Sequence, residues 1–131
     1  MRLLSLALAL NGFCGVAQAQ LAGDEWRTVE IGGVQIPSNA RVTIRFSDAG
    51  KVEGFGGCNR FFGAYTLAGD RLQVGQLGAT RMACPEPVMS NEARFLNALE
   101  DTRRYVREGI NLTLYDQIGK LVVRFTQNGT D

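Results

Sequence analysis

The feature that most constrains this chain is a pair of short segments that each contain a cysteine. The first segment is rich in glycine. The first segment is GFGGCNR, residues 54–60, and the second is TRMAC, residues 80–84. The third cysteine, Cys14, lies in an N-terminal stretch that we expect to be removed. Two cysteines that remain in a small domain of an oxidising compartment predict a disulfide, here between Cys58 and Cys84. We therefore expect a β domain that is cross-linked by a disulfide and located outside the cytoplasm.

The N-terminus indicates export. Arg2 supplies a positive charge, residues 3–10 are apolar, and residues 17–19 (AQA) match a signal peptidase site. We expect a signal peptide over residues 1–19 and a single domain over residues 20–131, located in the periplasm or secreted. The apolar run is shorter than the roughly 20 residues of a membrane-spanning helix. The alternative is an outer-membrane lipoprotein anchored through Cys14, although the residues before that cysteine fit a lipobox poorly.

Composition excludes several classes of function. The chain has 14 basic and 13 acidic residues, so loss of Arg2 leaves no net charge and no sign of nucleic-acid binding. It has no histidine, which removes Ser-His-Asp and Cys-His catalysis and the commonest zinc sites. The segment around Gly56 lacks the Lys-Ser/Thr of a phosphate loop, so its glycines indicate a bulge or a close backbone approach. We expect no metal, no cofactor, no transmembrane segment and a monomeric protein.

Alternating apolar residues predict a strand-rich fold. Val42, Ile44 and Phe46 alternate with polar residues, and turn residues recur about every ten positions. This spacing predicts an α+β, mostly β fold, in which a strongly curved antiparallel sheet or cracked small barrel carries one packed helix. The expected strands are 26–31, 42–46, 51–55, 61–67, 71–74, 104–107, 112–115 and 121–125.

The predicted helix lies between Pro87 and about Asp101, because prolines suit a helix start. At about 100° per residue, Glu92 falls in the middle of an apolar arc, beside Phe95 and Leu99. A buried carboxylate needs hydrogen bonds or a cation, and Arg60 and Arg81 flank the two cysteines. We therefore expect Glu92 to be buried and paired with one of these arginines in a structural role. The alternative is a ligand-binding or catalytic carboxylate.

These motifs resemble a known family. The blocks at residues 56–61 (GGCNRF), 63–65 (GAY) and 80–84, followed by Met89, Glu92 and Phe95, are similar in order and spacing to the META domain, the family of the bacterial heat-shock protein HslJ. The resemblance covers residues 24–126. It implies a nearly closed antiparallel sheet with one helix, an envelope location and no established enzymatic activity. The candidate structural or binding cluster comprises Asn59, Arg60, Thr80, Arg81 and Glu92.

Three functions follow as hypotheses. The resemblance favours a non-enzymatic, stress-related or accessory envelope protein that binds an envelope protein or a hydrophobic ligand. A second possibility is a pilotin-like secretion accessory or lipid-binding protein, because META domains are similar in shape to a pilotin that holds acyl chains in a cracked barrel. The third is a small hydrolase that depends on Glu92 or another carboxylate.

Overall fold

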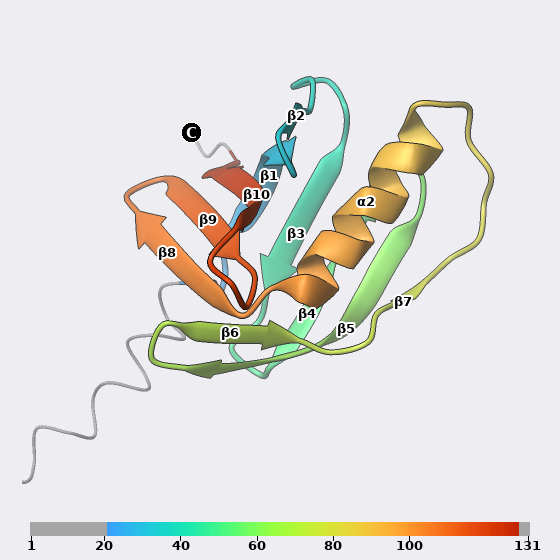
Figure 1. Ribbon diagram of the computed structural model, residues 1–131. Coiled ribbons are helices and arrows are strands. Elements are labelled where there is room, and N and C mark those ends of the chain that lie inside the picture. Colours follow the sequence, from blue (N-terminus) through green and yellow to red (C-terminus); the bar gives the residue numbers. More distant parts are fainter. Residues whose placement is uncertain (1–20, 129–131) are drawn as a thin grey trace, which may run out of the picture.

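The structure is a computed structural model that describes residues 21–128. The predicted signal peptide, the cleavage site before Gln20 and Cys14 lie outside the described residues. The elements labelled in Figure 1 are β1 (Glu25–Ile31), β2 (Val34–Gln35), β3 (Val42–Phe46), β4 (Lys51–Gly56), β5 (Arg60–Ala68), β6 (Arg71–Val74), β7 (Gly78–Ala79), α2 (Val88–Asp101), β8 (Arg104–Glu108), β9 (Asn111–Tyr115) and β10 (Leu121–Gln127).

Within residues 21–128, eight strands form a closed antiparallel barrel in the order β1, β3, β4, β5, β6, β8, β9 and β10. The ring closes where β10 pairs with β1, so that Thr28 lies opposite Phe125. The predicted fold class is confirmed, and the barrel is closed rather than cracked. All eight predicted strands are present. The two-residue strands β2 and β7, which pair with β1 and β5, were not predicted because they are too short to show an alternating pattern.

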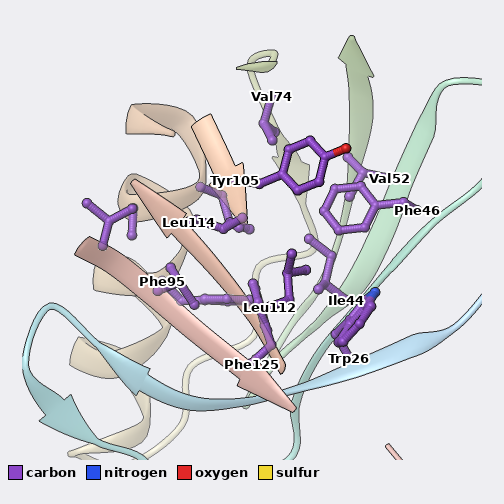
Figure 2. Close-up of a cluster of buried hydrophobic side chains, with 14 of the residues drawn as sticks. Trp26, Ile44, Phe46, Val52, Val74, Phe95, Tyr105, Leu112, Leu114 and Phe125 are labelled. Atoms are coloured by element: carbon purple, nitrogen blue, oxygen red, sulfur yellow. The ribbon is translucent and has the colours of Figure 1, made fainter. Parts of the chain in front are cut away.

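Large side chains fill the barrel interior. Along β3, Val42, Ile44 and Phe46 are buried while the residues between them face outward, as their period of two requires. In Figure 2, side chains from several strands and from α2 point toward one another. Phe95 makes edge-to-face contacts with Phe61 and Phe125, at ring-centroid distances of 5.6 and 6.2 Å. The space that a ligand would need inside the barrel is thus occupied by the protein's own core.

The helix α2 packs against the barrel. It contacts β1, β4, β6 and β10, and in Figure 1 it lies over the curved sheet. Its buried face consists of Glu92, Phe95, Ala98 and Leu99, which confirms the predicted apolar arc and the burial of Glu92. No helix within residues 21–128 is both long enough and apolar enough to cross a membrane.

Glycines in β4 allow the close approaches that the sequence predicted. A Cβ atom on Gly54 would lie 2.2 Å from the carbonyl oxygen of Thr43 and 2.6 Å from the ring of Phe61. Gly57, directly after β4, has a φ of +108°, which L side chains rarely adopt. The glycine-rich segment therefore serves tight packing and a sharp turn.

Candidate functional site

The disulfide joins two segments that flank the helix start. Cys58 lies in the turn between β4 and β5, and Cys84 lies in the segment that leads to α2. Their Cα atoms are 6.0 Å apart and their sulfurs are bonded, as predicted. The bridge holds residues 80–84 against the barrel, and it indicates a compartment that is oxidising.

Asn59 holds the same segment with its side-chain amide. Its Oδ1 accepts the Met82 N–H at 2.7 Å, and its Nδ2 donates to the Met82 carbonyl at 3.0 Å. The amide thus pairs with Met82 as a backbone peptide group would. The Thr80 hydroxyl also donates to Asn59 Oδ1, at 2.9 Å. Three contacts from one buried side chain fix residues 80–82.

Glu92 connects this arrangement to α2. It is 5% exposed, and its Oε1 accepts the backbone N–H groups of Cys58 at 3.0 Å and Asn59 at 2.7 Å. Its Oε2 accepts Asn59 Nδ2 at 2.8 Å. A Cβ atom on Gly56 would lie 2.9 Å from Oε1, so glycine is what lets the carboxylate reach the turn.

The predicted pairing of Glu92 with Arg60 or Arg81 is wrong. Both arginines are exposed, and the two ion pairs among residues 21–128 involve neither of them. The physical reason is that three N–H donors already supply the hydrogen bonds a buried carboxylate requires. The structure thus brings together Asn59, Thr80 and Glu92. Arg60 joins them through its backbone alone, because its N–H donates to Thr80 Oγ1 at 3.2 Å and its carbonyl accepts the Thr80 N–H at 3.0 Å.

Two open clefts lie on the outer surface beside this network. A cleft of about 480 Å³ runs over β3, β4 and β5, and Arg41, Phe55, Arg60 and Phe62 are among its lining residues. A second cleft, of about 650 Å³, is lined by Phe62 together with residues of the 77–82 segment and of α2. Phe62 therefore borders both clefts, and it is 55% exposed.

We call this surface the Phe62 face and define it by Arg41, Phe55, Arg60, Phe62, Arg81 and Met82. Met82 is 60% exposed, and the Arg41 guanidinium lies 5.0 Å from the centroid of the Phe55 ring. Sequence reasoning assigned no role to Phe62 and Met82. The signal for Phe62 was present, because Phe61 points into the core and its neighbour on a strand must point outward.

Glu92 is hydrogen-bonded through both of its carboxylate oxygens. All three of its hydrogen-bonding partners are backbone or amide N–H groups. Within residues 21–128, no cluster of three or more acidic, cysteine or histidine side chains could hold a metal ion. The network holds the chain around Met82, whereas Phe62 and the Met82 side chain are exposed.

Solved structures share this fold. A protein from Burkholderia xenovorans, determined by NMR, matches with a TM-score of 0.68 and 28% identity over 99% of both chains. A second NMR structure, 22% identical, has a TM-score of 0.68 and covers 83% of this chain and 92% of its own. A DUF4847 family protein from Bacteroides vulgatus ATCC 8482, seen in a crystal structure, is 17% identical, with a TM-score of 0.65 over 88% of this chain and 99% of its own.

A search among curated proteins found no match. The META domain, in contrast, matches residues 19–129, a range that contains Asn59, Glu92 and the two cysteines of the disulfide. The chain therefore belongs to the META domain family.

Proposed function

We propose that the protein is a non-enzymatic binding protein of the cell envelope that docks a protein partner on the Phe62 face. The observation that carries the proposal is the exposure of Phe62 and Met82, at 55% and 60%, along the second cleft, which both side chains line. Aromatic residues, methionine and arginine are the types enriched at the centres of protein interfaces. A stress-related or accessory role in the periplasm is consistent with this mode of action.

The charges around the two side chains indicate what the partner offers. Arg41 and Arg60 line the first cleft, Arg81 lines the second, and each is exposed. Glu25 and Glu53 also line the first cleft, but with Arg41, Arg45 and Arg60 its lining remains net positive. A segment that presents an apolar side chain flanked by carboxylates would match this surface, since complementary charges fix orientation and speed association.

Two other functions receive less support. A pilotin-like or lipid-binding role needs a cavity for acyl chains, whereas the barrel interior is packed with Trp26, Phe46, Phe95 and other large side chains. A hydrolase that used Glu92 would need this carboxylate to reach solvent, yet it is 5% exposed and bonded through both oxygens.

Site-specific photo-crosslinking in the native compartment tests the proposal. A photoreactive residue at position 62 or 82 should give the same discrete adduct, and one at Val106 on β8, an exposed apolar position away from the face, should not. The partner, once identified, should bind Met82→Ser at least tenfold more weakly. Val106→Ser should bind like the wild type.

Met82→Ser is the sharper variant, because Asn59 holds the backbone of Met82 and its side chain is exposed. The Phe62 ring also packs on Gly78, where a Cβ atom would lie 2.6 Å from the ring. Replacement of Phe62 would therefore change stability as well as binding. Adducts that form equally well from Val106, or a Met82→Ser protein that binds like the wild type, would refute the Phe62 face as the docking surface.

A further inference from the structure

A second surface, which shares no residue with the Phe62 face, lies where β6 meets β8. The barrel is weakest between β6 and β8, where the ladder contains one cross-strand pair, Arg71 opposite Arg104. The flanking hydrogen bonds run from the Leu72 N–H to the Arg103 carbonyl and from the Tyr105 N–H to the Asp70 carbonyl. This pattern makes Arg71 and Arg104 a non-hydrogen-bonded pair, the kind in which opposing side chains are closest.

Two arginines at such a position repel each other. Among residues 21–128, the ion pairs join Arg107 to Asp24 and Arg124 to Glu30, so neither Arg71 nor Arg104 has a carboxylate partner. The Arg104 guanidinium instead lies 4.7 Å from the centroid of the Tyr115 ring. Tyr115 belongs to β9, on the far side of β8 from β6, so this contact directs the Arg104 side chain toward β9.

Arg71 and Arg104 line the same cleft. A hollow of about 500 Å³ is lined by residues from β6, from the start of β8 and from the β9–β10 turn: Arg71, Gln73, Arg103, Arg104, Asp116, Gln117, Ile118 and Gly119. Arg103 is held in place because its Nη1 donates to the carbonyls of Glu100 and Thr102, at 2.9 and 2.7 Å. Three guanidinium groups and two side-chain amides therefore border one cleft.

Acidic groups near the cleft do not cancel this charge. Asp116 lines it, but its Oδ1 accepts the N–H groups of Ile118 and Lys120 at 3.1 and 2.9 Å and so shapes the turn. Asp101 lines an adjoining hollow of about 310 Å³ that shares Arg103 with the first. Three arginines thus face one aspartate in the main cleft, and an anion is the ligand that would balance them.

We propose that this cleft binds a phosphate group. Guanidinium forks match the oxygens of phosphate in paired hydrogen bonds, and donors that approach from β6 and β8 can contact different oxygens of one tetrahedral ion. Such a ligand would relieve the repulsion between Arg71 and Arg104. Ile118 lines the cleft and is 85% exposed, so its apolar side chain would lie beside the phosphate. If the phosphate belongs to a lipid headgroup, this side chain would insert into the membrane surface. A soluble phosphate ester would use the arginines alone.

The test uses residues 20–131 and two probes. In NMR titrations, glycerol phosphate should shift the amides of Gln73, Arg104 and Gln117, and sodium chloride of equal ionic strength should not. In sedimentation assays, vesicles that contain phosphatidylglycerol should bind the protein more tightly than vesicles of phosphatidylcholine. Arg71→Gln and Arg104→Gln should each weaken glycerol phosphate binding roughly tenfold or more, as expected for a lost charge-assisted hydrogen bond.

The matched control is Arg94→Gln, which removes the same charge from the exposed face of α2. Its binding should equal that of the wild type. Arg71→Gln should also be at least as stable as the wild type, because it removes a like-charge contact, so its loss of binding cannot be put down to unfolding. Ile118→Ser distinguishes the two sources. Weaker binding of Ile118→Ser to the vesicles alone identifies a lipid headgroup. A wild type that binds glycerol phosphate but does not prefer the phosphatidylglycerol vesicles identifies a soluble ester.

The proposal is overturned if glycerol phosphate fails to shift these amides in the wild type. It is also overturned if Arg71→Gln and Arg104→Gln both bind glycerol phosphate normally, or if Arg94→Gln weakens binding as much as they do. None of these results bears on the Phe62 face, whose test relies on other residues.

Discussion

The side-chain amide of Asn59 and the carboxylate of Glu92 meet at 2.8 Å and join the β4–β5 turn to helix α2. The same amide binds both backbone groups of Met82, and the same carboxylate binds two backbone N–H groups of the turn. One pair of side chains therefore fixes three segments: the turn, the helix and the chain around Cys84. From this arrangement we expect Glu92 to have a structural role.

Glu92→Ala should destabilise the protein by about 3 kcal/mol, because it leaves the buried N–H groups of Cys58 and Asn59 without an acceptor. Glu92→Gln should cost less, about 1–2 kcal/mol, because its amide oxygen can still accept from the turn while its NH₂ group opposes Asn59 Nδ2. Urea denaturation of the three proteins measures these differences. A Glu92→Ala protein as stable as the wild type would contradict the structural role.

The arginine beside Cys84 provides the matched control. Arg81→Ala should leave stability within about 0.5 kcal/mol of the wild type, and its effect should add to that of Glu92→Ala. The reason is that the exposed Arg81 forms no ion pair with Glu92 in the structure. A coupling energy above about 1 kcal/mol in this double-mutant cycle would instead show that the pair interacts.

Reduction of the Cys58–Cys84 bond should destabilise the protein by roughly 3 kcal/mol on the chain-entropy estimate, without unfolding the barrel. The barrel should persist because the closing β1–β10 pairing and the aromatic core do not depend on the bridge. Denaturation of the Cys58→Ala/Cys84→Ala variant, compared with the oxidised wild type, gives the difference. Mass measurement after alkylation, with and without reductant, checks the bond itself. Two free thiols in freshly isolated protein would disprove the pairing.

Stability should fall above about pH 10 because of two buried tyrosines. Burial, and to a smaller degree the charge of Asp48, raises the pKa of Tyr65, and burial with Asp70 raises the pKa of Tyr105. When the pKa of a tyrosine is higher in the folded state than in the unfolded state, its contribution to stability is constant below the unfolded-state pKa. That contribution is lost as the pH rises above the unfolded-state pKa. Tyr65→Phe should therefore flatten the decline in urea stability above about pH 10. An equally steep decline in Tyr65→Phe would contradict this assignment.

The sequence predicted the parts of the structure that depend on local periodicity. Alternation located β3, and helical spacing placed Glu92 on the buried face of α2. The partner of Glu92 was mispredicted because two of its three donors are backbone N–H groups, which are presented by a turn in which Gly57 has a φ of +108°. Charged side chains are visible in a sequence, whereas the direction of a peptide N–H is not.

The cleft at Arg71 and Arg104 illustrates a second limit. These residues are 33 positions apart in the chain, and they become neighbours only through the single β6–β8 pair. Periodicity places each arginine on the outward face of its strand, but it does not say which strands are adjacent. Long-range strand order is a property of the closed barrel, so this candidate site could not be predicted from the residues alone.

Gly56→Ala should destabilise the wild-type protein but should have almost no effect on the stability of the Glu92→Ala variant. A Cβ atom on Gly56 would lie 2.8 Å from Glu92 Cγ and 2.9 Å from Oε1, so that the carboxylate must leave its donors. The expected cost is about 1–3 kcal/mol in the wild type and near zero in Glu92→Ala, where the clash disappears. Gly75→Ala is the matched control, since its nearest neighbour would be the Ala64 carbonyl oxygen at an ordinary 3.6 Å. Urea denaturation of the four proteins in the cycle, with Gly75→Ala alongside, measures the coupling. Equal costs of Gly56→Ala in both backgrounds would mean that this glycine is needed for the turn itself and not for the approach of Glu92.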